Sequence, residues 1–296
     1  MSITEYLDKN ADFVDDFLDR HLNEPAAPSR LIEAMRYGVL KGGKKIRASL
    51  LFATGEAFSI TLENLLPLAA AIEMIHSFSL VHDDLPSIDN DDFRRGKPSL
   101  HRAYNEGMGV LAGDALLVDG LRLIVTDQNF TGRFGLEKGW EIVGILLEAL
   151  GSAGMVGGQV FDIENEGRQA SWDEVRRIYR MKTAGFIQAP ILCAAVAGGC
   201  SPGEKEVLSR FGLFLGECFQ MVDDLLDISQ PSKRLGKTAG KDLVQQKATL
   251  VRLFGTDRTR EFLDKTYREA LSVVSALDRP LDNLLAIAAF IVERNH

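Results

Sequence analysis

Cysteine is scarce in this sequence. Its 296 residues include only three cysteines, Cys193, Cys200 and Cys218. Their odd number and the absence of a Cys-x-x-Cys pair argue against a disulfide framework, a zinc ribbon and a redox pair. Three free thiols fit a reducing compartment, so we expect a cytoplasmic protein.

Positive charge, export signals and membrane spans are also lacking. The 34 Lys and Arg residues are outnumbered by 42 Asp and Glu residues, which gives a formal net charge of −8. Because a nucleic-acid backbone calls for a basic surface, we expect no nucleic-acid partner. The first residues contain no basic segment followed by an apolar one, so we expect no export. The longest uncharged run, 183–203, contains Pro190 and several glycines. We interpret it as a buried helix followed by a turn and predict no membrane span.

Strand patterns are rare, and helical periodicity takes their place. Apolar residues recur at helical spacing throughout, whereas two-residue alternation hardly occurs. The spacing predicts two helices before Gly42 and others at about 65–84, 110–126, 138–155, 173–198, 204–228, 258–275 and 281–294. No Pro/Ser-rich linker, composition shift or repeat divides the chain. We therefore predict one all-α domain, residues 1–296, in which helices pack around a common centre.

A first acidic segment follows the long apolar helix at 65–84. It contains Asp83, Asp84, Asp89, Asp91 and Asp92. A helix C-terminus carries negative partial charge, so carboxylates there are unfavourable unless a counter-ion offsets them. Clustered carboxylates without His or Cys suit Mg²⁺ or Ca²⁺ rather than Zn²⁺. Taken alone, the segment is also compatible with a solvated acidic turn.

A second acidic segment favours the metal interpretation. Asp223 and Asp227 are four residues apart in a predicted helix, so their side chains share one face, and Asp224 lies between them among apolar residues. Like charges so placed destabilise a helix that has no counter-ion. Two such groups at the ends of apolar helices can face one another across a bundle. Mg²⁺ held there would complete its coordination shell with water and substrate phosphate oxygens.

Basic residues accompany both acidic segments. They are Lys44, Lys45, Arg47, Arg94, Arg95, Lys182, Lys237, Lys241 and Lys247. Lys and Arg beside metal-binding carboxylates match a polyanion such as a diphosphate. The sequence contains no Ser-His-Asp arrangement, His-Glu-x-x-His motif or complete P-loop. The chemistry that it predicts therefore needs metal ions and cations rather than a nucleophilic side chain.

Together these motifs resemble those of the trans-isoprenyl diphosphate synthases, in particular the bacterial farnesyl diphosphate synthases (geranyltranstransferases). The matching segments are Gly42-Gly43-Lys44-x-x-Arg47, His76, Asp83-Asp84-x-x-x-x-Asp89, Arg94-Arg95-Gly96, Gly157-Gly158-Gln159-x-x-Asp162, Lys182-Thr183, Gln220-x-x-Asp223-Asp224-x-x-Asp227, Gly236-Lys237 and Lys247. One departure is Ala48, where such enzymes commonly have proline.

The resemblance implies a helical bundle around a deep central cavity, in a homodimer. It implies Mg²⁺-dependent head-to-tail condensation of isopentenyl diphosphate with dimethylallyl or geranyl diphosphate, giving farnesyl diphosphate (C15). Several Mg²⁺ ions would be held on the allylic diphosphate by Asp83, Asp84, Asp89, Asp223, Asp224 and Asp227. The catalytic set would comprise Asp83, Asp84, Asp89, Lys182, Asp223 and Asp224. The allylic diphosphate would also contact Arg94, Lys182, Thr183, Gln220, Lys237 and Lys247, and isopentenyl diphosphate would contact Lys44, Arg47, His76 and Arg95.

Phe78 is the candidate for limiting product length. It lies five residues before Asp83, about 7–8 Å deeper along a helix axis, where a phenyl ring would stop a growing chain and Ser79 beside it would not. An aromatic residue at this position resembles the pattern of bacterial enzymes of the family that stop at C15. The alternatives are a geranylgeranyl diphosphate (C20) synthase, a class I terpene cyclase and a non-catalytic synthase subunit. The residues for isopentenyl diphosphate argue against the cyclase, and the intact aspartates argue against a silent subunit.

Overall fold

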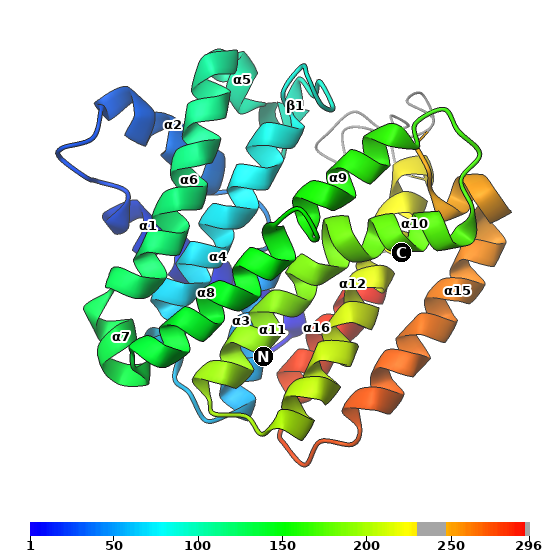
Figure 1. Cartoon of the computed structure of the whole chain (residues 1–296). Coiled ribbons are helices and arrows are strands. Elements are labelled where there is room, and N and C mark those ends of the chain that lie inside the picture. Colours follow the sequence, from blue (N-terminus) through cyan, green and yellow to red (C-terminus); the bar gives the residue numbers. More distant parts are fainter. Residues whose placement is uncertain (230–246, 294–296) are drawn as a thin grey trace. The chain divides into compact units, whose positions relative to one another are not determined.

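The computed structural model describes residues 1–229 and 247–293 (Figure 1). The described chain divides into two compact units. We call Met1–Phe52 with Thr61–Gly139 the N-terminal unit, and Ala53–Ile60 with 140–229 and 247–293 the C-terminal unit. Both are helical, and the strands in the described part are β1 (Phe93–Arg94) and β2 (Lys97–Pro98), an antiparallel pair. The prediction of an all-α fold is confirmed, and that of a single domain stays a prediction.

The N-terminal unit is built on a buried central helix. Its elements are α1 (Ile3–His21), α2 (Ser29–Val39), α4 (Leu62–Asp83), α5 (Leu100–Ala103), α6 (Glu106–Thr126), α7 (Gln128–Phe134) and the start of α3 (Ile46–Ala57). Helix α4 is apolar on nearly all faces and packs against α1, α2 and α6, as an enclosed helix should. Gly120 allows α6 to approach α4 closely, because a Cβ there would lie 3.1 Å from the carbonyl oxygen of Ala71.

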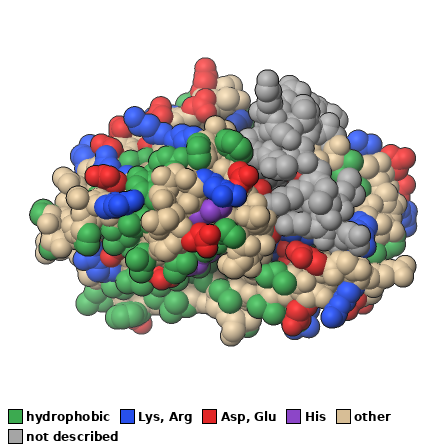
Figure 2. All heavy atoms as spheres, turned by 90° about the horizontal axis from the view of Figure 1, so that it is seen from above, with side chains coloured by type: hydrophobic (Ala, Val, Ile, Leu, Met, Phe, Trp, Pro, Cys, Tyr) green, Lys and Arg blue, Asp and Glu red, His purple; other side chains and the backbone are tan. Residues whose placement is uncertain are grey.

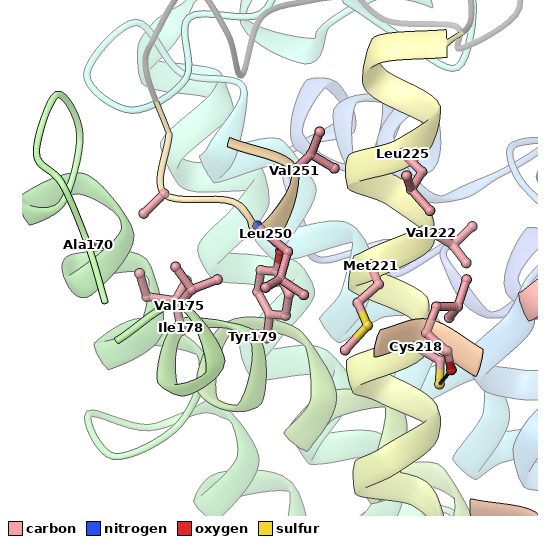
Figure 3. Close-up of a cluster of buried hydrophobic side chains, with 12 residues drawn as sticks. Ala170, Val175, Ile178, Tyr179, Cys218, Met221, Val222, Leu225, Leu250 and Val251 are labelled. Carbon is pink, nitrogen blue, oxygen red and sulfur yellow. Dashed lines mark hydrogen bonds between the residues drawn. The ribbon is translucent and has the colours of Figure 1, made fainter. Parts of the chain in front are cut away.

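The C-terminal unit surrounds a long helix, α12 (Pro202–Ser229). Its other elements are most of α8 (Leu136–Leu150), α9 (Met155–Glu164), α10 (Trp172–Ile178), the π-helix η1 (Tyr179–Ala184), α11 (Gly185–Ala197), α15 (Leu250–Val274) and α16 (Asp282–Glu293). Helix α12 packs against η1, α11, α15 and α16. A hydrophobic cluster joins α10, η1, α12 and α15, and includes Tyr179, Met221 and Leu250 (Figure 3).

Several predicted boundaries are wrong. The helix predicted at 173–198 is interrupted by the six-residue π-helix η1, for which the apolar periodicity contains no signal. The helix predicted at 138–155 ends at Leu150, and α9 begins at Met155 after a turn with glycines at both ends, Gly151 and Gly154. Helices α3, α7 and α9 were not predicted. Gly135, with φ 84°, is the C-cap of α7.

Two described segments are long and apolar enough to cross a membrane by length and composition, Leu62–Asp83 and Leu136–Glu164. In the most apolar window of each, 72% and 39% of the residues are buried. The first is therefore explained as a core helix. The uncharged run at 183–203 is largely the buried helix α11, as predicted.

Candidate active site

In the N-terminal unit, the first acidic segment begins where α4 ends. Asp83 is the last residue of α4 and Asp84 is its C-cap. The chain then folds back on the helix end, because the backbone N–H of Asp89 donates to the carbonyl of Asp83 at 2.9 Å and that of Asp91 donates to the carbonyl of Asp84 at 3.1 Å. The carboxylates are thus gathered at a helix C-terminus, as the sequence predicts.

Asp84 is buried against Arg94. The Arg94 Nε lies 3.0 and 3.2 Å from the two carboxylate oxygens of Asp84, and its Nη2 donates to the same group. Arg94 also lies 3.7 Å from the Asp91 carboxylate. Burial raises the pKa of Asp84 to about 6, although the hydrogen bonds and charge of Arg94 oppose this. Arg94, predicted to bind substrate, is here the partner of a predicted metal ligand.

Arg95 lies in the tight turn between β1 and β2. Both residues of this turn have positive φ, 53° at Arg95 and 75° at Gly96, which the favoured two-residue hairpin turn requires. The hairpin is attached to α2 by the Tyr37 hydroxyl, which donates to the carbonyl of Pro98 at 2.7 Å. The Arg95 side chain lies over Gly42, where a Cβ would come within 2.8 Å of its Cδ. This close approach explains the Gly-Gly pair before Lys44.

Arg47, His76 and Arg95, which were predicted to bind isopentenyl diphosphate, lie close together. Arg47 Nη1 donates to His76 Nε2 at 3.1 Å. Burial lowers the pKa of His76 well below its usual value, and Arg47, Arg95 and Lys45 lower it further. A guanidinium can only donate, so the neutral imidazole carries its proton on Nδ1. Lys44, predicted to belong to this group, is an exposed residue of the preceding turn.

Asp15 and Glu73 support this group and were not predicted as part of the site, whereas Lys45 was named among the basic residues near the acidic segments. Lys45 is buried, with its Nζ 2.5 Å from the carbonyl of Val39 and 3.3 Å from the Asp15 carboxylate. Glu73 is buried in α4 and accepts from the backbone N–H of Ala48 at 3.1 Å, at the N-terminus of α3. A carboxylate there is favoured by the helix dipole. Glu73 could have been recognised in the sequence, because it is an acidic residue inside a largely apolar helix.

Phe78 is half-buried and has a defined neighbour. Its ring meets that of His82 edge to face, with centroids 5.1 Å apart. His82 Nε2 is 3.1 Å from the carbonyl oxygen of Val110, and its ring occupies space that any side chain at Gly113 would fill, because a Cβ there would lie 2.2 Å from Nε2. The Ser79 hydroxyl donates to the carbonyl of His76 at 2.8 Å.

In the C-terminal unit, the second acidic segment lies near the end of α12. Asp224 and Asp227 are both 2% exposed, and Asp223 is half-buried. The Asp224 carboxylate accepts hydrogen bonds from Gln220 Nε2 at 3.0 Å and from the Tyr179 hydroxyl. The Thr183 hydroxyl donates to Gln220 Oε1 at 2.7 Å. Thr183 and Gln220, predicted to bind substrate, are therefore linked to a predicted metal ligand.

Lys182 and Lys247 converge on Asp162. Lys182 Nζ lies 2.6 Å and Lys247 Nζ 3.7 Å from the same oxygen of this buried carboxylate. The glycine before Gln159 explains how α9 reaches this position, since a Cβ on Gly158 would lie 2.3 Å from the backbone nitrogen of Lys182. Lys237 and Lys241 lie outside the described residues.

The side chains fit Mg²⁺ that is shared with a phosphate ligand. Within 1–229 and 247–293, no three His, Cys, Asp or Glu side chains converge closely enough to hold a metal ion alone. The candidate ligands are carboxylates, which Mg²⁺ prefers, and it commonly takes only one or two from the protein and the rest from water and phosphate oxygens. On the face drawn in Figure 2, acidic and basic side chains are interspersed, unlike the basic stripe of a nucleic-acid-binding surface.

The sequence profile of the polyprenyl synthetase family matches residues 28–282. The chain belongs to this family. A geranylgeranyl pyrophosphate synthase of Catharanthus roseus is 41% identical over 271 residues, covering 91% of this chain and 75% of the relative. A farnesyl diphosphate synthase of Micrococcus luteus is 37% identical over 294 residues, covering 99% of each chain.

Solved structures agree with this assignment. A Helicobacter pylori geranyltransferase, solved with magnesium and isoprenyl diphosphate, superposes with a TM-score of 0.86 at 30% identity, covering 98% of both chains. This polyprenyl synthetase is a trans-isoprenyl diphosphate synthase, and its chemistry is prenyl transfer. Its relatives include enzymes named for C15 and for C20 products.

Proposed function

We propose that this polyprenyl synthetase condenses isopentenyl diphosphate with dimethylallyl and geranyl diphosphate, in the presence of Mg²⁺, and releases farnesyl diphosphate. The observation that carries the proposal is the cation group around His76 in the N-terminal unit, formed by Arg47, Arg95 and Lys45, with Arg94 and the buried Asp84 alongside. Cationic side chains of this kind bind diphosphate groups, and the carboxylates beside them bind the Mg²⁺ that accompanies a diphosphate.

The residues divide into two roles in this proposal. Arg47, Arg95 and Lys44 bind isopentenyl diphosphate, and Arg47 is oriented by its hydrogen bond to the neutral His76 ring. Lys182 and Lys247, aligned on the Asp162 carboxylate, bind the allylic diphosphate. Two oriented lysines stabilise an oxyanion more effectively than two mobile ones, because little reorganisation is needed as charge develops.

The residues that would hold Mg²⁺ are Asp83, Asp84 and Asp89 in the N-terminal unit and Asp223, Asp224 and Asp227 in the C-terminal unit. When bound, Mg²⁺ stabilises the charge that develops on the leaving diphosphate. The allylic carbon then reacts with the alkene of isopentenyl diphosphate, which the arginines hold in place. The proton is lost to the released diphosphate. In this proposal His76 orients Arg47 and does not act as the general base, because its Nε2 already accepts a hydrogen bond from Arg47.

Phe78 supports a C15 product. Its ring is fixed by the edge contact with His82, which the adjacent Gly113 makes possible. A fixed aromatic ring five residues before Asp83, about 1.4 helical turns, resists displacement by a growing chain. The C20 alternative is favoured by the 41% identity to the geranylgeranyl pyrophosphate synthase of Catharanthus roseus.

Chain-length analysis tests the proposal. The protein is incubated with labelled isopentenyl diphosphate, Mg²⁺ and either dimethylallyl or geranyl diphosphate, and the dephosphorylated products are separated by length. We expect labelled C15 product from both primers and none with excess chelator. A labelled C20 product would replace the C15 assignment, and an unlabelled cyclic hydrocarbon would indicate a cyclase.

We also propose that the enzyme acts as a homodimer in the cytoplasm. Leu136, Trp140 and Leu147 share one face of α8 and are 59%, 63% and 51% exposed. Open space adjoins Gly144 between them. An apolar helix face of this kind favours a partner surface. The three free cysteines fit a reducing compartment. Sedimentation equilibrium measures the mass in solution, and a monomer at micromolar concentration would contradict the dimer.

A further inference from the structure

Tyr179 is a buried residue to which neither the sequence motifs nor the proposed reaction assigns a role. It is the first residue of η1 and is only 2% exposed. Its hydroxyl accepts a hydrogen bond from the backbone N–H of Leu250 at 2.9 Å and donates to the Asp224 carboxylate. Figure 3 shows Tyr179 beside Leu250 within the hydrophobic cluster of this unit.

The direction of these two hydrogen bonds is settled by chemistry. A backbone N–H can only donate, so the Tyr179 oxygen must accept from Leu250, and its own proton is then available for Asp224. Leu250 is the first residue of α15, whose leading N–H groups have no partner inside the helix. One hydroxyl thus satisfies a helix end and orients a carboxylate.

The other carboxylate oxygen of Asp224 accepts a hydrogen bond from a residue of its own helix, α12. Gln220 Nε2 donates to Asp224 Oδ1 at 3.0 Å, and the Thr183 hydroxyl donates to the Gln220 carbonyl at 2.7 Å. Tyr179 and Thr183 both belong to η1. Each carboxylate oxygen of Asp224 therefore accepts a hydrogen bond from a described side chain.

We propose that Tyr179 is a positioning residue for Asp224, fixing the carboxylate in the orientation that binds Mg²⁺. The inference rests on the proposed function, in which Asp224 is a metal ligand. Hydrogen-bond partners of ligating carboxylates typically account for a factor of about 10–100 in metal affinity. Through Leu250, the same hydroxyl ties Asp224 to the segment that begins with Lys247 and so to the Asp162 group.

A matched pair of hydroxyl deletions tests the role. Tyr179→Phe removes the donor and keeps the ring. Tyr267→Phe removes a hydroxyl from a residue packed against the same hydrophobic cluster and leaves Asp224 untouched. For Tyr179→Phe we expect the Mg²⁺ concentration for half-maximal prenyl transfer to rise about 10- to 100-fold, with the KM for isopentenyl diphosphate unchanged. Tyr267→Phe should behave as the wild type.

Binding gives a second readout that does not require turnover. Titration calorimetry measures the affinity of each protein for inorganic pyrophosphate at fixed Mg²⁺, and we expect a weakening of about tenfold or more for Tyr179→Phe alone. In an Asp224→Asn background the same substitution should change this affinity less than about twofold, because the two residues act as a unit. Circular dichroism melting verifies folding, and Tyr179→Met replaces Tyr179→Phe if the latter does not fold.

The outcomes separate the two proposals. Wild-type protein without prenyl transfer would contradict the proposed function, and the pyrophosphate titration would still decide the role of Tyr179. An active wild type with unchanged Mg²⁺ dependence and pyrophosphate affinity in Tyr179→Phe would overturn the positioning role. A lower melting temperature alone, without a change in either quantity, would also overturn it.

Discussion

The two units hold their buried aspartates in different ways. In the N-terminal unit Asp84 is oriented by the guanidinium of Arg94, which reaches it from a β-hairpin. In the C-terminal unit Asp224 is oriented by a hydroxyl and an amide, Tyr179 and Gln220, which reach it from helices. A charged partner offsets part of the carboxylate charge, whereas hydroxyl and amide donors orient it with little change in net charge. We infer that Arg94 adjusts the charge of Asp84, whereas Tyr179 and Gln220 fix the orientation of Asp224.

The largest effect should come from neutralising either carboxylate. Asp84→Asn and Asp224→Asn each preserve shape but remove a negative charge, so we expect kcat to fall by at least about 100-fold in both. The double variant should be little worse than either single one, because the residues serve one step. Initial rates at saturating substrates and Mg²⁺ measure this. If either single variant retains a nearly normal kcat, the carboxylate of that unit is not needed for the reaction.

A crossed pair of substitutions should separate substrate recognition between the units. Arg47→Gln is expected to raise the KM for isopentenyl diphosphate about 10- to 100-fold, the value of a hydrogen bond to a charged group, and to leave the allylic KM unchanged. Lys182→Gln should show the reverse pattern. Both KM values are measured for each variant by varying one substrate at a time. If both substitutions affect the same substrate, the division of roles is wrong.

The burial of Asp84 predicts a pH effect on stability in the N-terminal unit, although its charged partner Arg94 opposes the shift. Asp84 has a folded pKa of about 6, above the value of about 3.9 for an unfolded chain. A raised carboxyl pKa means that the folded state binds the proton more tightly. Its contribution to stability is therefore full below pH about 3.9 and is lost as the pH rises towards about 6.

Urea unfolding of the metal-free protein between pH 4 and pH 7 measures this contribution. The difference between the wild type and Asp84→Asn cancels the other titrating groups. We expect the wild type to lose about 2 kcal/mol relative to the variant across this range, given about 1.4 kcal/mol per unit of pKa. Parallel curves for the two proteins would contradict the raised pKa.

The smallest effect on rate, but the clearest on product, is expected at Phe78. Phe78→Ala should shift the product from C15 towards longer chains, because the ring that stops the growing chain is gone, while overall turnover changes by less than about threefold. Ser79→Ala is the matched control and should retain the C15 product, since its hydroxyl is engaged with the backbone of His76. An unchanged product profile in Phe78→Ala would place the length limit elsewhere.

The sequence predicts the helices that have a clear apolar stripe or a long apolar run. Helix α4 and the acidic segment at its end follow from the pattern around Asp83. Helix α3 was missed, because its apolar residues are spread over all faces. Three basic residues also lie at or just before its start, namely Lys44, Lys45 and Arg47. The π-helix was missed because the extra residue per turn depends on packing of η1 against α9 and α12, not on local propensity.

The charged residues of the candidate site could be predicted from the sequence, but the residues that position them through hydrogen bonds and ion pairs could not. Charge and spacing indicated Arg47, Arg94 and Lys182, but the partners of Arg94 and Lys182 depend on tertiary contacts. Tyr179 looks like an ordinary core aromatic in the sequence, since only the fold places a carboxylate at its hydroxyl. The roles of the six aspartates in metal binding stay predictions of the family resemblance.

The π-helix has one more consequence. An α-helix turns by about 100° per residue, so an inserted residue offsets the phase of everything that follows by about that angle. Deleting a single amino acid from 179–184 would restore ordinary helical winding and relieve the poorer hydrogen bonding of a π turn. If the deleted residue lies between Tyr179 and Thr183, these two residues would stand three positions apart instead of four. Their hydroxyls would then no longer be spaced to reach Asp224 and Gln220 at the same time.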